Sequence, residues 1–140
     1  QLLDWKIDLV ILAGFMRILS AKFVQAWQGK MVNIHPSLLP YYKGMHTHQR
    51  VLNTGDVWHG CTVHYVTAEL DAGQALTQGV LKVNLQDDVD SLASRVHVLE
   101  HLIYPQAVEW ICNGTLQHTA EGQVLYKGQP LVEPIQFCKL

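Results

Sequence analysis

Apolar residues near the start of the chain form a continuous run. Residues 8–13 (Asp-Leu-Val-Ile-Leu-Ala) precede Gly14, which is typical of a β-strand buried on both faces of a parallel sheet. Ser20 can cap a short helix that ends near Gln28 and carries Phe23, Val24 and Trp27 on one face. Residues 30–34 are predicted to form a second short strand. Residues 35–44 hold two prolines and are predicted to form a loop.

A short helix is predicted after this loop, at residues 48–53, and it is ended by Gly55. Residues 61–67 and 75–83 are rich in β-forming side chains and predict two strands. The longest helix is expected to open at Asp87 or Asp88, because apolar residues then recur at steps of three and four. They are Val89, Leu92, Val96, Leu99 and Ile103.

The end of this helix and the segment after it are marked by Pro105 and two glycines. Pro105 is expected to kink or interrupt the helix, and Gly114 to end it. Residues 115–126 predict a hairpin that turns near Glu121-Gly122. Strands and helices alternate first and strands cluster later. The pattern therefore predicts an α/β fold, an open, mostly parallel Rossmann-like sheet with mixed edge strands.

Length and composition fit a single domain over residues 1–140. The chain is 49% hydrophobic and 16% charged, as expected of a folded globular protein. Its formal net charge is −2, and the Lys and Arg residues are scattered, which argues against a nucleic-acid partner. The chain opens with Gln1 inside a helical-looking segment, without a plausible first strand. We therefore interpret it as a domain whose amino-terminal part is missing.

Cysteine content and hydropathy predict the compartment. Cys61, Cys112 and Cys138 show no paired spacing, and an odd count fits a reducing environment, so we expect a cytoplasmic protein with buried, structural cysteines. The longest apolar stretch, residues 9–15, is too short to span a bilayer, so no membrane association is expected.

Candidate chemistry follows the second predicted strand. Asn33 and His35 are two residues apart, so their side chains point the same way from the strand end, where open α/β sheets bind ligands. Asp71 precedes an Ala-Gly step after another strand and could reach His35. An amide and an imidazolium can both donate to a developing oxyanion, while the carboxylate keeps the imidazole charged and relays protons.

This set of side chains suits acyl transfer. Removing one oxyanion donor typically reduces the rate about 10²–10³-fold, and losing a positioned acid or base about 10²–10⁴-fold. No Ser or Cys is placed as a nucleophile, which favours direct attack by an amine of the substrate. An Asn-x-His at a strand end is also found in ordinary turns, so these residues alone leave both interpretations open.

Four motifs in a fixed order are more specific. They are Leu-Ala-Gly-Phe-Met-Arg-Ile-Leu at 12–19, Asn-Ile-His-Pro-Ser-Leu-Leu-Pro at 33–40, Gly-Cys-Thr-Val-His at 60–64 and Leu-Asp-Ala-Gly at 70–73. Together they resemble the glycinamide ribonucleotide formyltransferases of purine synthesis, over essentially all 140 residues. The resemblance implies the formyltransferase fold. It also implies transfer of a formyl group from 10-formyltetrahydrofolate, a co-substrate, to the amine of glycinamide ribonucleotide.

The same resemblance implies roles for individual residues. It assigns the catalytic trio to Asn33, His35 and Asp71. It implies that two loops line the pterin site, largely through backbone groups, and they contain Met16, Arg17, Ile18, Leu19, Val66, Thr67 and Asp71. Glu100 matches a family residue that holds the ribose hydroxyls, and the backbone near Ile34 and Pro36 flanks the same substrate. A monomer or homodimer is expected.

Histidine pairs elsewhere could suggest a metal. His46 and His48 lie two apart, and His97 and His101 lie four apart on the long helix, but neither pair has a third ligand nearby in the sequence. No metal is therefore expected. His64, on a strand facing the same region, is expected to support the site rather than react.

Three alternatives to the transferase remain. Formyltetrahydrofolate hydrolases share the trio but typically have His-His-Ser-Phe-Leu-Pro where this chain has His-Pro-Ser-Leu-Leu-Pro at 35–40. A methionyl-tRNA formyltransferase should carry a basic extension for its RNA. A folate-binding fragment without turnover is the third, because the resemblance implies that the loop that holds the substrate phosphate precedes Gln1.

Overall fold

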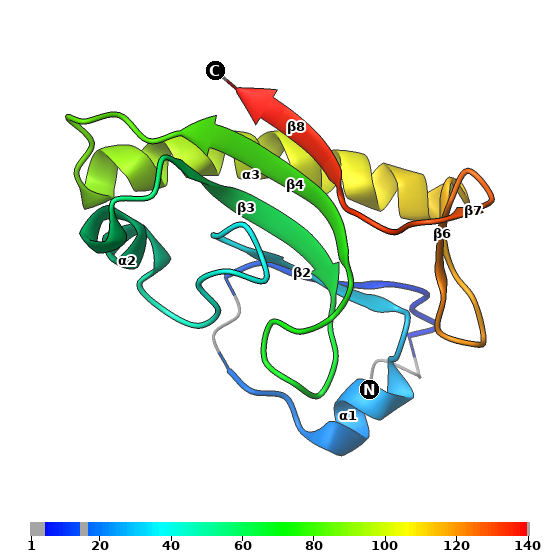
Figure 1. Cartoon of the computed structure of the whole chain (residues 1–140). Helices are drawn as coiled ribbons and strands as arrows, with labels where there is room; N and C mark the ends of the chain where they lie inside the picture. Colours follow the sequence, from blue (N-terminus) through cyan, green and yellow to red (C-terminus); the bar gives the residue numbers. More distant parts are fainter. Residues whose placement is uncertain (1–4, 15–16, 140) are drawn as a thin grey trace.

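The structure is a computed structural model, and it describes residues 5–14 and 17–139. Its main feature is a five-stranded open sheet in the order β1-β2-β3-β4-β8 (Figure 1). The strands are β1 (Val10–Leu12), β2 (Met31–His35), β3 (Trp58–Tyr65), β4 (Ala75–Lys82) and β8 (Ile135–Lys139). β1 pairs with β2 and β4 with β8 in parallel, and the two central pairings are antiparallel. The predicted α/β class with an open sheet is confirmed, but the antiparallel pairings, expected at the edges, lie in the middle of the described sheet.

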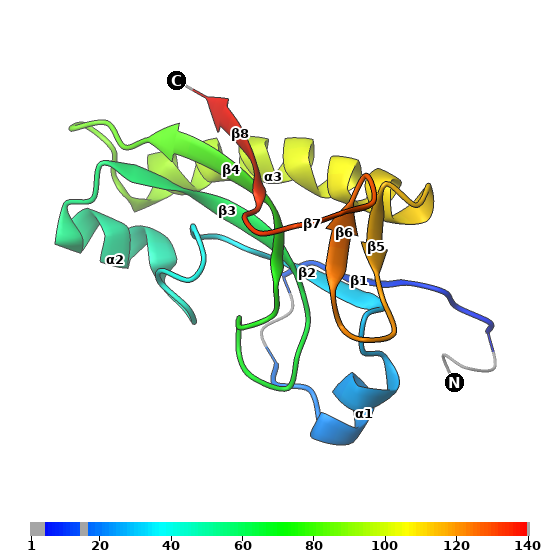
Figure 2. The same cartoon turned by 45° about the vertical axis from the view of Figure 1, so that its right-hand side comes forward.

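The long helix α3 (Val89–Cys112) lies across one face of this sheet (Figures 1 and 2). It begins as predicted at Asp88, whose side chain accepts from the Ser91 N–H while the Ser91 hydroxyl accepts from the Asp88 N–H. The helix sits close to the sheet because β4 carries Gly79, where a Cβ atom would lie 2.9 Å from Cβ of Leu99. Only glycine allows this approach.

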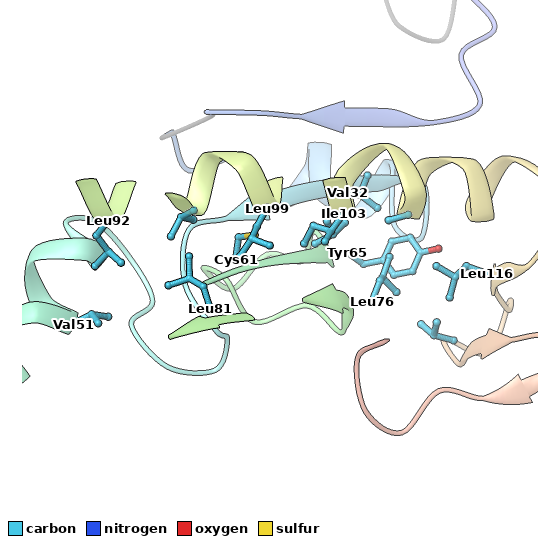
Figure 3. Close-up of a cluster of buried hydrophobic side chains, with 14 residues drawn as sticks. Val32, Val51, Cys61, Tyr65, Leu76, Leu81, Leu92, Leu99, Ile103 and Leu116 are labelled. Atoms are coloured by element: carbon cyan, nitrogen blue, oxygen red, sulfur yellow. The ribbon is translucent and has the colours of Figure 1, made fainter. Parts of the chain in front are cut away.

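The core lies between α3 and the sheet (Figure 3). Of the five apolar residues that recur at steps of three and four along the helix, Leu92, Val96, Leu99 and Ile103 are buried as predicted, whereas Val89 is only half-buried. The sheet contributes Val32, Cys61, Val63, Tyr65, Leu76 and Leu81. Pro105 lies within α3 and does not interrupt it. The buried residues Ile103 and Ala107 hold the helix against the sheet on both sides of the proline, and this packing offsets the lost hydrogen bond.

The shorter helices are α1 (Ala21–Ala26) and α2 (Thr47–Thr54). The Ser20 hydroxyl caps α1 as predicted, by accepting from the Phe23 N–H at 3.2 Å, although the helix ends two residues earlier than expected. α2 ends at Gly55, which adopts a left-handed φ of 79°.

A second, three-stranded sheet follows α3, made of β5 (Leu116–His118), β6 (Val124–Tyr126) and β7 (Gln129–Pro130). The hairpin of β5 and β6 is confirmed, with Gly122 in its turn at a φ of 87°. β7 and β8 were not predicted. β7 has only two residues, and β8 follows Pro134 at the edge of the main sheet, where local sequence signals are weak.

Three expectations about burial need correction. β1 is not buried on both faces, because it is the edge strand of the described sheet and borders a cavity; Ile11 is 47% exposed. Cys112 and Cys138 are exposed, because they lie at the end of α3 and on edge strand β8, and only Cys61 is buried. Within the described ranges, none of the helices combines the length and the apolar character needed to cross a membrane.

Candidate active site

A cavity of about 900 Å³ opens at the carboxyl ends of β1 and β2. Its walls come from the end of β1, the loop before α1, the end of β2, the loop that leads to α2, the loop between β3 and β4, and one face of α3. This is the position at which open α/β sheets place their ligands.

The structure brings the predicted trio together at this cavity. Nδ1 of His35 lies 3.5 Å from Oδ2 of Asp71, and both side chains are more than 90% buried. Asn33 lines the same cavity from β2. Asp71 reaches His35 from the loop between β3 and β4, where its backbone adopts a left-handed φ of 49°.

The two ring nitrogens of His35 face different partners. Nε2 lies 2.8 Å from the carbonyl oxygen of Tyr42. A carbonyl oxygen can only accept, so Nε2 carries a proton. Nδ1 faces the carboxylate of Asp71, which also accepts from the Gly44 N–H at 2.9 Å. Both ring nitrogens of His35 therefore face oxygen acceptors.

Two buried polar atoms at the site lack a partner among the described residues, Oδ1 of Asn33 and Nε2 of His64. Leaving a buried polar group unpaired typically costs about 1–3 kcal/mol. Because Asn33 and His64 both line the cavity, their side chains are available to a ligand or to water.

His64 lies beside Asp71 and can influence it. Its Nδ1 lies 2.9 Å from the Tyr65 carbonyl oxygen, and its Nε2 lies 4.0 Å from Oδ1 of Asp71. Burial lowers the pKa of His64, although the bond to Tyr65 and the charge of Asp71 oppose this shift. Nδ1 of His64 thus donates to Tyr65, while its Nε2 faces the carboxylate of Asp71.

The residues predicted to bind folate and substrate lie around the same cavity. Its lining includes Arg17, Ile18, Leu19, Val66, Thr67, Ile34, Pro36 and Glu100. Met16 lies outside the described residues. Glu100 is held in place by His97, whose Nδ1 lies 2.8 Å from its carboxylate.

The sequence did not reveal several residues that shape the site. Tyr42 and Gly44 contact the trio through backbone atoms, which no side-chain pattern indicates. The Tyr104 hydroxyl, on α3, donates to the carbonyl oxygen of Leu12 and lies 3.2 Å from the carbonyl oxygen of Val32, and burial raises its pKa. These contacts tie α3 to the end of β1 and to the start of β2.

Three histidines of the pairs noted in the sequence, His48, His97 and His101, each lie next to another histidine. His48 pairs with His59, with Nδ1 and Nε2 2.9 Å apart, and burial lowers the pKa of His59 to about 4. His97 and His101 stack with ring centroids 6.2 Å apart. Over residues 5–14 and 17–139, no group of three or more His, Cys, Asp or Glu side chains could hold a metal ion.

The model of the formyl transferase family matches residues 1–108. The chain belongs to the formyl transferase family. Among curated relatives, it is 49% identical over 110 residues to phosphoribosylglycinamide formyltransferase of Escherichia coli strain K12, covering 79% of this chain and 52% of the relative. It is 48% identical over 123 residues to the human trifunctional purine biosynthetic protein adenosine-3, covering 88% of this chain and 12% of that protein.

Solved structures of related enzymes have the same fold as this chain. Phosphoribosylglycinamide formyltransferase from Coxiella burnetii superposes with a TM-score of 0.87 at 44% identity, covering 94% of this chain and 63% of that one. The enzyme from Anaplasma phagocytophilum gives 0.89 at 40% identity, covering 99% and 67%. A formyltetrahydrofolate deformylase from Pseudomonas syringae gives 0.81 at 25% identity, covering 88% and 41%. The chain thus spans only about half of the E. coli relative, and a small part of the human protein.

Proposed function

We propose that this chain carries the catalytic centre of a folate-dependent formyltransferase that moves a formyl group from 10-formyltetrahydrofolate to the amine of glycinamide ribonucleotide. The observation that carries the proposal is the convergence of Asn33 and His35, from strand β2, and Asp71, from the loop between β3 and β4, on one cavity. The name of the E. coli relative, phosphoribosylglycinamide formyltransferase, supports the same formyl acceptor. The enzyme is expected to act in the cytoplasm, without a metal, as a monomer or homodimer.

In the proposed reaction, the substrate amine attacks the formyl carbon directly. A C–N bond forms, and the electron pair of the carbonyl moves to its oxygen, where the amide N–H of Asn33 and the imidazolium of His35 donate hydrogen bonds. Nε2 of His35 is hydrogen-bonded to Tyr42, and Nδ1 faces Asp71. During the reaction, one of these ring N–H groups would therefore donate both to its present neighbour and to the oxyanion.

Collapse of the tetrahedral intermediate completes the transfer. The bond from the formyl carbon to the folate nitrogen breaks as that nitrogen takes up a proton, and the attacking amine loses one. Asp71 relays this proton, directly or through water, and its burial beside His35 keeps the relay short.

The two ligands would occupy different parts of the cavity. The loops with Arg17–Leu19 and Val66–Asp71 would hold the pterin of the folate, largely through backbone groups. Glu100 would bind the ribose hydroxyls of the nucleotide, and the backbone near Ile34 and Pro36 would flank the same substrate. All of these residues line the one cavity, which supports this arrangement.

The test incubates the chain with 10-formyltetrahydrofolate, with and without glycinamide ribonucleotide, and follows the folate product. Product that depends on the amine supports the transferase. Product formed equally fast without the amine would instead support a hydrolase, the activity named for the Pseudomonas syringae neighbour. Folate binding without product would contradict turnover by this chain.

A further inference from the structure

Two side chains from neighbouring strands hold the backbone that follows His35. The Thr62 hydroxyl, on β3, donates to the Ser37 carbonyl oxygen at 2.7 Å and accepts from the Leu39 N–H at 3.1 Å. The Gln78 amide, on β4, donates to the Leu39 carbonyl oxygen at 2.9 Å and contacts the Thr62 hydroxyl at 3.1 Å. Thr62 is 0% and Gln78 4% exposed, so water does not compete for these bonds.

Donor counting fixes the direction of every bond in this group. Thr62 has one hydroxyl proton, and the Ser37 carbonyl can only accept it. The contact between Gln78 and Thr62 is therefore an amide N–H donated to the hydroxyl oxygen. The Oε1 atom of Gln78 then faces the Gln136 amide at 3.1 Å. Neither Thr62 nor Gln78 lines the cavity, so neither would touch a substrate there.

The segment that they hold leads directly to the atoms that orient the trio. The Ser37 hydroxyl donates to the Tyr41 carbonyl oxygen at 2.6 Å, and the Tyr41 N–H donates to the Leu38 carbonyl oxygen at 3.0 Å. Residues 37–41 are thus one hydrogen-bonded unit. The next residue, Tyr42, accepts from His35, and Gly44 donates to Asp71.

We propose that Thr62 and Gln78 are positioning residues for the formyl transfer. They fix residues 37–39, and through them the Tyr42 carbonyl and the Gly44 N–H, so that His35 and Asp71 keep the orientation that the reaction needs. This inference rests on the proposed function for its catalytic consequence. Its geometric part can be tested without turnover.

The first test measures the geometry by NMR in the full chain. The His35 ring N–H donated to Tyr42 should give a slowly exchanging proton signal, and the Gly44 amide a shift typical of a bond to a carboxylate. Thr62→Val and Gln78→Met nearly keep the side-chain shape but remove the donors, and both signals should be lost or displaced. Thr62→Ser keeps the hydroxyl and should restore them.

Gln136→Met is the matched control. It removes a hydrogen bond to Gln78 but none to residues 37–39, so the His35 and Gly44 signals should stay in place. Unchanged signals in folded Thr62→Val and Gln78→Met, or an equal change in Gln136→Met, would overturn the proposal. Should the Val and Met variants fail to fold, amide hydrogen exchange of the parent chain tests the coupling between residues 37–39 and Gly44 instead. The Leu39 and Gly44 amides should open together, and independent opening would overturn the coupling.

The second test is kinetic and uses the same variants. A displacement of about 1 Å can reduce a rate about 100-fold. Thr62→Val and Gln78→Met should therefore lower kcat by roughly 10–100-fold while the KM for the folate stays near that of the parent. A rise in KM without a fall in kcat would overturn the assigned role. Absence of transfer by the parent would instead contradict the proposed function, and the NMR result would still decide the positioning.

Discussion

The carboxylate of Asp71 approaches His35 from a turn in which Asp71 itself has left-handed backbone geometry, with Oδ2 3.5 Å from Nδ1. Few residues other than glycine adopt this conformation readily, but aspartate and asparagine do. The charge at this position can therefore be removed without straining the turn, and this makes the contact a direct test of the proposed chemistry.

Asp71→Asn should nearly abolish formyl transfer and leave folate binding mostly intact. The change removes the proton relay and the negative charge that faces the His35 ring, and losing a positioned acid or base reduces rates about 10²–10⁴-fold. Single-turnover kinetics and folate titration would measure the two effects separately. A loss of folate affinity as large as the loss of rate would contradict the role given to Asp71.

Gly73→Ala should displace the turn that carries Asp71. A Cβ atom at Gly73 would lie 1.6 Å from the Tyr65 carbonyl oxygen, so the backbone that carries Asp71 has to move. We expect a destabilisation of about 1–3 kcal/mol and a loss of activity in the folded fraction of up to about 100-fold. Denaturant unfolding and kcat provide the measurement. Ala72→Ser, at the exposed neighbouring position, should behave like the parent.

Tyr104→Phe should loosen the link of α3 to the end of β1 and the start of β2. The substitution removes the hydroxyl bonded to Leu12 and Val32, at a loss of about 1 kcal/mol in stability. Because Leu12 precedes the loop proposed to bind folate, affinity for folate should weaken about fivefold, equivalent to roughly 1 kcal/mol. Calorimetry would measure both. Tyr126→Phe, in the hairpin, should leave folate affinity unchanged, and an equal loss there would argue against a local effect.

The His48–His59 pair should make stability depend on pH. Burial, and then the neighbouring His48, lowers the pKa of His59 from 6.5 to about 4. Between these values the unfolded chain binds more protons than the folded one, so the free energy of unfolding rises with pH across this window. Protonating His59 fully would cost on the order of 3 kcal/mol.

Urea unfolding from pH 4 to pH 7 would check this dependence. His59→Asn should flatten it, and His101→Asn, at an exposed position, should not. A parent chain equally stable at pH 4.5 and pH 7 would contradict the prediction.

Sequence patterns predicted the elements whose signals are local. α3 could be foreseen because its apolar residues repeat at the helical period and Asp88 caps it, and the β5–β6 hairpin because of its turn residues. Asn33 and His35 could be expected to share one side of a strand end because they are two residues apart. β3 runs antiparallel to β2, so Asp71 meets His35 only because the loop after β3 turns back toward it. No local pattern, however, fixes the distance between His35 and Asp71.

What the sequence did not predict depends on partners that lie far apart along the chain. The Gln78 amide donates to the carbonyl oxygen of Leu39, 39 residues away. His48, on α2, contacts His59, on β3. The helix continues through Pro105 because packing of Ile103 and Ala107 outweighs the local preference of proline. Tertiary contacts decide each of these features, and periodicity and motifs carry no information about them.

Helix α3 takes part in two regions of the molecule. One side, with Leu92, Leu99 and Ile103, is buried in the core, and another, with Glu100 and Tyr104, faces the cavity. A compound that binds in the cavity of the folded chain therefore also stabilises the domain against thermal unfolding. The gain is about 1.4 kcal/mol for each tenfold excess of its concentration over its Kd. Thermal shift measurements can thus rank inhibitors of this protein before any assay of formyl transfer is established.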